Sequence, residues 1–304
     1  MVSTLWTLAI IFLALLIVTI AIYGVKKKEP NKDFTDVSMR VKTWWGMFVV
    51  FGMATLFTQT VSLISLAVLC FFALKEYFSM MKTRKADRRL FLWSYLAIPI
   101  QFYWIYIGWY GMFIVFIPVY VFLFLPLPRL LGKGTSGFLR SVSSTQWGVM
   151  LMVFGLSHLA FFQIASPQYG ANLVLFLVVL TQVNDVAHHF ISIYFGKRKV
   201  VPSANQNITW EGFIGAVIIT VLVAYFIYPH LTPFSVKAAL LSGLLISITG
   251  FFGSLTISVL KRDLLLGNEE KRRTIKGTYL NRVDSLTYTS PVFLHVIRYF
   301  FDFM

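Results

Sequence analysis

Three carboxylate side chains lie inside or at the edge of long apolar segments. Asp185 falls within the run VLTQVNDVAHHFISIYF, whereas Glu211 and Asp284 each follow a polar loop and open an apolar segment. An ionisable residue within a membrane segment is costly and is therefore a candidate for function. Carboxylates that converge near a membrane interface can hold Mg²⁺, which takes oxygen ligands from protein and substrate phosphates. For Glu211 and Asp284 the structural alternative is helix capping, whereas Asp185 lies deeper.

Other polar residues near these carboxylates are weaker candidates for metal binding. His188 and His189 follow Asp185, but adjacent side chains on a helix point about 100° apart, so both cannot easily face one site. Cys70 is the only cysteine and lies in an apolar run, so the sequence excludes an internal disulfide. A buried structural thiol is the expectation for it.

Two basic clusters end apolar segments and could bind the phosphates of a lipid or nucleotide. Lys197, Arg198 and Lys199 form one, and Lys261 and Arg262 form the other. The alternative is that these residues only fix the orientation of the protein in a membrane, as basic residues of cytoplasmic loops do.

The elements that carry these residues are expected to be transmembrane helices. The 304 residues are 58% hydrophobic and only 13% charged, whereas soluble domains carry about 25% charged residues. Residues 5–25 form a run without a charge, and about 20 such residues cross a bilayer. We predict an all-α polytopic bundle with about ten apolar segments (8–10). They lie near 5–25, 44–58, 60–78, 90–109, 111–128, 147–165, 171–195, 211–229, 236–260 and 284–303.

The basic residues support this segment count. If the segments alternate in direction, five loops share one side and hold 25 of the 27 lysines and arginines; these loops are 26–43, 75–89, 129–146, 196–210 and 261–283. The positive-inside rule places them in the cytoplasm and the N-terminus outside. Topology therefore explains most of the net charge of +15. Nucleic acid is not expected as a partner, because no basic domain stands apart.

Two stretches resemble one family of membrane enzymes. Residues 184–212 read NDVAHHFISIYFGKRKVVPSANQNITWEG, and 253–292 read GSLTISVLKRDLLLGNEEKRRTIKGTYLNRVDSLTYTSPV. The first resembles the phosphatidate cytidylyltransferase (CDP-diacylglycerol synthase) segment with T-D, F-G-K-x-K-x-x-P and T-W-E-G. The second resembles that family's C-terminal signature, with K-R and L-D-R-x-D-S-L in register. The resemblance covers about 120 C-terminal residues.

The resemblance implies a reaction, partners and roles for particular residues. The family makes CDP-diacylglycerol and pyrophosphate from CTP and phosphatidate, and it needs a divalent metal, here expected to be Mg²⁺. Positioning and charge neutralisation are the main catalytic demands. The implied catalytic residues are Asp185, Lys261, Arg262, Arg282 and Asp284. Substrate binding would involve Lys197, Lys199, Trp210, Glu211 and Lys276, with Trp210 and Glu211 ordering their loop. A homodimer is implied only by the family.

The sequence also departs from the family's pattern at its metal chemistry. Ser254 replaces the aspartate of G-D, and Asn281 replaces the aspartate of L-D-R. Both still offer oxygen to a metal shared with Asp185 and Asp284, but neither supplies charge. The K-D pair becomes Gly267-Asn268, P-G-H-G-G becomes residues 274–278 (TIKGT), and S-P-K-K becomes residues 205–208 (NQNI).

These observations leave several functions open. The first is a working cytidylyltransferase acting on phosphatidate or a related lipid phosphate. A relative that has lost catalysis and binds lipid or a partner enzyme is the second, and a CTP-dependent polyprenol or phytol kinase-like enzyme is the third. We expect residues 1–140 to form an N-terminal transmembrane region and 141–304 the cytidylyltransferase-like region. A bacterial inner membrane, with the site on the cytoplasmic side, is the expected location.

Overall fold

The described part of the chain is almost entirely helical. The computed structural model describes residues 2–28, 34–81, 87–131, 137–202, 208–265 and 279–300. Within these ranges the only β-type pairing is an isolated antiparallel bridge between Lys199 and Thr209. The predicted all-α class is therefore confirmed, and each predicted apolar segment lies largely on helix.

The helices follow the apolar segments closely. The first half contains α1 (Val2–Lys28), α2 (Thr35–Leu56), α3 (Gln59–Met80), α4 (Arg88–Tyr106), and a composite of α5 (Tyr110–Val115), η2 (Phe116–Val121), α6 (Phe122–Phe124) and α7 (Leu127–Leu130). The second half contains α8 (Phe138–Val149), η3 (Met150–Gly155), α9 (Leu156–Ala165), α10 (Gly170–Phe195), α11 (Trp210–Leu231), α12 (Val236–Leu265), α14 (Leu280–Val283) and α15 (Leu286–Phe300). η2 and η3 are π-helical turns; Pro118 lies in η2, where its missing N–H suits a widened turn.

The protein is an integral membrane protein. Among the described residues, seven helical stretches are long and apolar enough to cross a bilayer: 4–28, 59–80, 110–130, 138–165, 170–195, 210–231 and 236–265. The apolar part of α2 is shorter, from Val41 to Leu56, and α15 has 15 residues. The predicted count of about ten crossing segments is thus not confirmed, and the outside location of the N-terminus stays a prediction.

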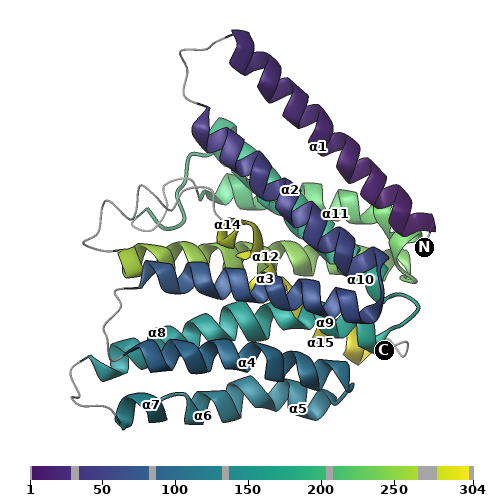
Figure 1. Cartoon of the computed structure of the whole chain (residues 1–304). Coiled ribbons are helices and arrows are strands. Elements are labelled where there is room, and N and C mark those ends of the chain that lie inside the picture. The colour runs from purple at the N-terminus through teal and green to yellow at the C-terminus, as the bar shows by residue number, and fades with distance from the viewer. Residues whose placement is uncertain are drawn as a thin grey trace.

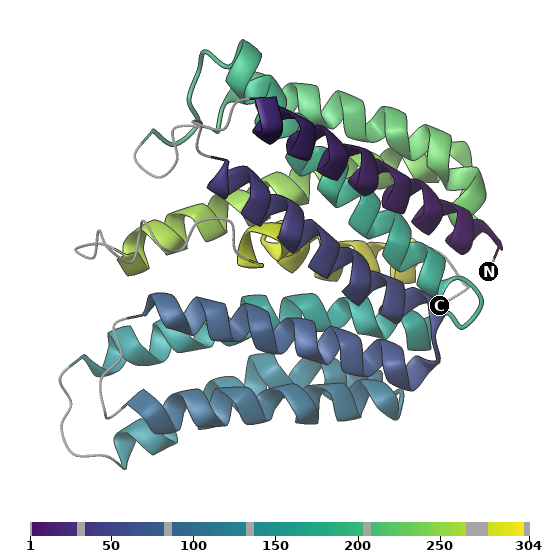
Figure 2. The same ribbon diagram turned by 45° about the horizontal axis from the view of Figure 1, so that its top comes forward.

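The C-terminal helices occupy the centre of the bundle. Figures 1 and 2 show α12, α14 and α15 between two groups, with α1, α2, α10 and α11 on one side and α3, α4, α8 and α9 on the other. The short α15 contacts α9, α10 and α12. Two glycines of neighbouring helices lie close to the backbone at the start of α15. A Cβ on Gly155 of η3 would lie 2.5 Å from the carbonyl oxygen of Thr287, and a Cβ on Gly253 of α12 would lie 3.0 Å from the carbonyl oxygen of Asp284. These glycines allow the backbone that opens α15 to lie between neighbouring helices.

Polar contacts sort the helix ends into two groups. At one end, the Tyr77 hydroxyl of α3 donates to the carbonyl oxygen of Ser144 in α8 at 2.8 Å. At the other end, the Thr4 hydroxyl of α1 donates to Oδ1 of Asn172 in α10 at 2.7 Å. The ends of α3 and α12 that precede the predicted basic loops both lie on the left of Figure 1.

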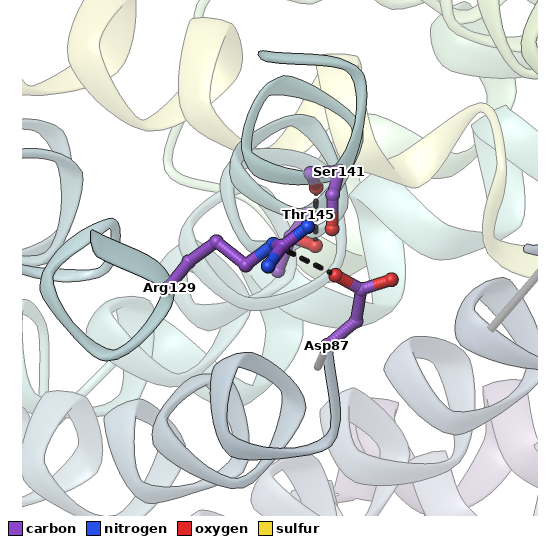
Figure 3. A network of polar contacts seen from close by, with 4 residues as sticks. All are labelled: Asp87, Arg129, Ser141 and Thr145. Carbon is purple, nitrogen blue, oxygen red and sulfur yellow. Dashed lines mark hydrogen bonds and ion pairs between the residues drawn. The ribbon is translucent and has the colours of Figure 1, made fainter. Parts of the chain in front are cut away.

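A buried ion pair closes the end where α4, α7 and α8 meet. Nε of Arg129 lies 3.4 Å from Oδ1 of Asp87, and both side chains are only 4% exposed. Figure 3 shows the Arg129 side chain reaching past Ser141 and Thr145 of α8 toward Asp87. The Thr145 hydroxyl donates to the carbonyl oxygen of Ser141 at 2.8 Å. Removing one member of a buried ion pair is costly, so substitution of either residue is expected to destabilise this end of the bundle.

Candidate active site

The hydroxyl of Ser285, in the turn between α14 and α15, joins the deepest predicted carboxylate to the C-terminal signature. The Ser285 hydroxyl is fully buried and donates to Oδ1 of Asp185 on α10 at 2.6 Å. Oδ1 of Asp284 accepts the Ser285 backbone N–H at 2.9 Å. One serine therefore orients both carboxylates, which are close enough to interact electrostatically. The close approach of Gly253 to the backbone of Asp284 fixes this turn against α12.

Two predicted cations lie beside this carboxylate pair. Arg282 interacts electrostatically with both Asp185 and Asp284, and Lys261 interacts with Asp284. The Lys261 amino group also donates to Oδ1 of Asn281, which places the residue that replaces the family's aspartate directly against a lysine. The structure thus brings together four residues from α10, α12 and the α14–α15 turn that the sequence assigned to one site.

Glu76 is a further carboxylate of this cluster that the sequence analysis missed. It lies near the C-terminal end of α3, and its Oε2 accepts the backbone N–H of Leu280 at 3.2 Å. It also interacts electrostatically with Lys261. Residue 76 falls within a predicted loop (75–89), so the sequence offered no signal that it faces the C-terminal signature.

Arg282 is held by two residues that the sequence analysis did not single out. Its guanidinium carbon lies 5.1 Å from the centre of the Trp44 ring on α2. The Gln182 side-chain amide of α10 donates to the Arg282 backbone oxygen at 3.0 Å. A cation over an indole face is favourable. Trp44 of α2 therefore helps to position the guanidinium of Arg282.

Glu211 organises the loop between α10 and α11. Its carboxylate accepts the backbone N–H groups of Lys197 and Arg198 at 3.1–3.2 Å. The Thr209 hydroxyl caps α11 by accepting the Gly212 N–H at 3.1 Å and donates to Ser192 at 3.0 Å. The residue that caps the N-terminus of α11 is therefore Thr209 and not Glu211. Glu211 clamps the loop backbone, as expected for a residue that orders it.

The remaining predicted site residues lie apart from the cluster or outside the described residues. The Lys197 and Lys199 side chains are exposed, and so is Arg262. Trp210 is 48% exposed beside Phe213, with their ring centres 6.1 Å apart. Lys276 and the altered stretches at 205–207, 267–268 and 274–278 lie outside the described residues, whereas Ile208 is buried.

Ser254 lies one residue beyond the close approach of Gly253 to Asp284. It is therefore on the helix segment that meets the site.

Two of the carboxylates could offer oxygen to a small divalent cation. Asp185 and Asp284 each use Oδ1 for a bond to Ser285, which leaves Oδ2 of each for a ligand. Mg²⁺ commonly takes one or two protein carboxylates and completes its shell with water and substrate phosphates. In the described part of the chain, no group of three or more His, Cys, Asp and Glu side chains is gathered for a metal. His188 instead packs edge-on against Phe251, 5.7 Å between ring centres.

Residues 38–300 match the model of the cytidylyltransferase family. The chain belongs to this family. It is 36% identical to the uncharacterized protein YnbB of Escherichia coli, over 96% of this chain and 98% of that protein. It is also 32% and 30% identical to the phosphatidate cytidylyltransferases of Haemophilus influenzae and Bacillus subtilis, in each case over 44% of this chain. These matches cover 48% and 50% of the two enzymes, so the chain spans about half of their length.

Membership of the cytidylyltransferase family agrees with the resemblance seen in the sequence and extends it. The family match begins at residue 38, whereas the motifs lie between residues 184 and 292. The contacts of Glu76 and Trp44 with residues 280 and 282 show that helices preceding the motifs also reach the candidate site. α2 and α3 form one wall of the site that carries the C-terminal motifs.

Proposed function

We propose that this protein transfers CMP from CTP to a lipid phosphate, phosphatidate or a close relative, and releases pyrophosphate. The observation that carries the proposal is the pair of carboxylates Asp185 and Asp284, tied together by Ser285 with Lys261 and Arg282 beside them. Phosphoryl transfer needs positioning and charge neutralisation more than covalent chemistry from the protein. This cluster supplies both anions for a cation and cations for phosphates.

The reaction can be written without a protein nucleophile. An oxygen of the lipid phosphate forms a bond to the α-phosphorus of CTP, and the bond from that phosphorus to the bridging oxygen of pyrophosphate breaks. Because the attacking oxygen is already anionic, no general base is needed. Lys261 and Arg282 are suited to bind the phosphates and to offset the charge on the departing pyrophosphate.

Asp185 and Asp284 would hold the Mg²⁺ ion, with Ser254 and Asn281 as neutral oxygen donors at the family's other positions. When bound, the ion supplies charge neutralisation at the phosphates. Ser285 keeps the Asp185 carboxylate in place through its hydroxyl. Glu211 holds the 196–210 backbone, and the lysines of that loop would meet the nucleotide or lipid headgroups.

The depth of the cluster suits a lipid headgroup. Gly253, which contacts Asp284, is 17 residues from the start of α12, or about 26 Å along the helix axis at 1.5 Å per residue. A hydrocarbon core is about 30 Å thick, so a helix that starts at one surface reaches the other near this residue. With the basic loops in the cytoplasm, the site opens to cytoplasmic CTP, in a bacterial inner membrane.

One observation favours a second candidate function, a relative that binds lipid without turnover. Lys261 is bonded to Asn281 instead of an aspartate, and Ser254 supplies no charge at the other altered position. A weakened metal site could retain lipid and nucleotide binding while losing catalysis.

The deciding experiment is product analysis with purified protein. The protein in detergent is mixed with phosphatidate, labelled CTP and Mg²⁺, and the lipid and nucleotide products are separated. Formation of CDP-diacylglycerol and pyrophosphate supports the cytidylyltransferase. CDP with a newly phosphorylated lipid alcohol, in a parallel assay with polyprenol or phytol, would indicate the kinase-like reaction instead. Binding of CTP without any product across several lipid phosphates and metals would favour the non-catalytic relative.

A further inference from the structure

An apolar groove runs along the outer face of the bundle between α1, α2 and α10. Its volume is about 330 Å³. The lining is apolar except for the Gln182 amide and the indole of Trp44, and its other members include Leu8, Ala14, Val18, Phe51 and Val179. Figures 1 and 2 show α1 lying alongside α2 with its far side uncovered. α1 is therefore a wall of the groove, and its opposite side faces lipid.

Two residues that line the groove also contact the candidate active site. Gln182 and Trp44 line the groove. The same Gln182 donates to the backbone oxygen of Arg282, and the same Trp44 carries the Arg282 guanidinium over its ring. An apolar surface is thus continuous with the cation that lies beside Asp185 and Asp284.

The length of the groove matches one leaflet of a membrane. Its α1 lining extends from Leu8 to Val18, which is about 15 Å of helix at 1.5 Å per residue. This is about half of a hydrocarbon core of roughly 30 Å. A lipid whose phosphate lies at Arg282 has acyl chains that run toward the middle of the bilayer over this same distance.

The wall is held in place near both of its ends. Thr4 is buried and donates to Asn172 of α10 at 2.7 Å. Toward the other end, the indole N–H of Trp45 donates to the Thr19 hydroxyl at 3.1 Å. These two bonds flank the groove lining, so α1 is attached to α10 and α2 while leaving the space between them open.

We propose that this groove receives one acyl chain of the lipid phosphate substrate, which orients its phosphate toward Arg282; this inference rests on the proposed function. Moving an acyl chain from the bilayer into an apolar groove exchanges one apolar environment for another, so the groove adds little affinity. Its contribution is orientation, since it aligns the lipid before the phosphate reaches the nucleotide.

Photo-crosslinking in nanodiscs tests the assignment. Phosphatidate with a diazirine on one acyl chain is compared with phosphatidylcholine that carries the same chain, and labelled peptides are mapped by mass spectrometry. We expect the phosphatidate probe to label the groove face of α1 and α10 several-fold more than the phosphatidylcholine probe. Ala14→Phe and Val179→Phe should fill the groove and lower this labelling. Ala9→Phe, on the exposed face of α1 outside the groove lining, should leave it unchanged.

The outcomes separate this inference from the proposed function. Equal labelling by the two probes would show that the groove holds bulk lipid, and the assignment would be overturned. The same conclusion follows if CDP-lipid forms normally and the groove is not labelled. Selective labelling without any CDP-lipid product would leave the lipid site standing and refute the transferase reaction. Normal thermal stability of the variants shows that changes in labelling do not come from unfolding.

Discussion

Ser285→Ala is the most informative single substitution, because Ser285 touches both carboxylates of the site. The change removes the 2.6 Å hydrogen bond to Asp185 and leaves the backbone bond to Asp284 in place. A hydrogen bond to a charged group contributes about 1.5–3 kcal/mol. If all of it serves to orient Asp185 for the metal and substrate, kcat/KM should fall roughly 10- to 150-fold.

The matched control is Ser290→Ala in α15, the helix that begins directly after Ser285. Ser290 is equally buried, but its hydroxyl donates at 2.7 Å only to Leu286, within α15 itself. We expect this variant to keep activity close to that of the unmodified protein. The assay is the initial rate of CDP-lipid formation over a range of Mg²⁺ concentrations, with thermal unfolding in detergent measured in parallel.

Asp185→Asn completes a double-mutant cycle with Ser285→Ala. Since the serine acts through Asp185, the double variant should be little worse than Asp185→Asn alone. The reasoning would be refuted if Ser285→Ala matched the Ser290→Ala control, or if the two losses were fully additive. A rise in the Mg²⁺ concentration needed for half-maximal rate would distinguish loss of carboxylate orientation from a general loss of folded protein.

The other predictions address the loop, the ion pair and the glycine contact. Glu211→Gln should speed hydrogen exchange of the two loop amides that donate to the carboxylate, and unchanged protection would contradict the clamp. Asp87→Asn should destabilise the protein, by at most about 3–5 kcal/mol, because it removes the ion pair with the buried Arg129; unfolding in detergent with an unshifted midpoint would argue against this. Gly253→Ala should lower activity, because its Cβ would lie 3.0 Å from Asp284 O and overpacking costs about 1–3 kcal/mol. Gly52→Ala, with open space around it, is the matched control, and equal activity of the two would refute the role of the close contact.

The sequence predicted the helices well because their signal is local. Long apolar runs without charge specify membrane helices through their length and composition alone. The π-helical turns η2 and η3 were not foreseen, since a widened turn leaves no mark on hydropathy. The short α15 was predicted as a full segment, 284–303, because the sequence shows its apolar length but not its start inside the bundle.

The site was only partly predictable because its members differ in how their positions are specified. Asp185, Lys261 and Asp284 stand in motifs, and the structure places them together. Glu76 and Trp44 reach the site through packing of α3 and α2 on α14, which is a long-range property that no spacing along the chain reveals. Arg262 shows the opposite case: it follows Lys261 in the K-R motif, but the helical turn directs it to the exposed side.

Charge balance relates the altered signature to the chemistry that the site can perform. Counted by formal charge, Asp185, Asp284 and Glu76 carry three negative charges, and Lys261 and Arg282 carry two positive ones. The net charge of this cluster is therefore minus one. Aspartates at positions 254 and 281 would make it minus three.

One divalent ion brings the actual cluster to plus one, which suits the binding of anionic phosphates. The hypothetical cluster would remain at minus one with one ion and would repel them. The neutral residues Ser254 and Asn281 are therefore compatible with a site that would use a single cation. Loss of two carboxylates is consequently not equivalent to loss of function. It would change the number of divalent ions that the cluster's own charge could support.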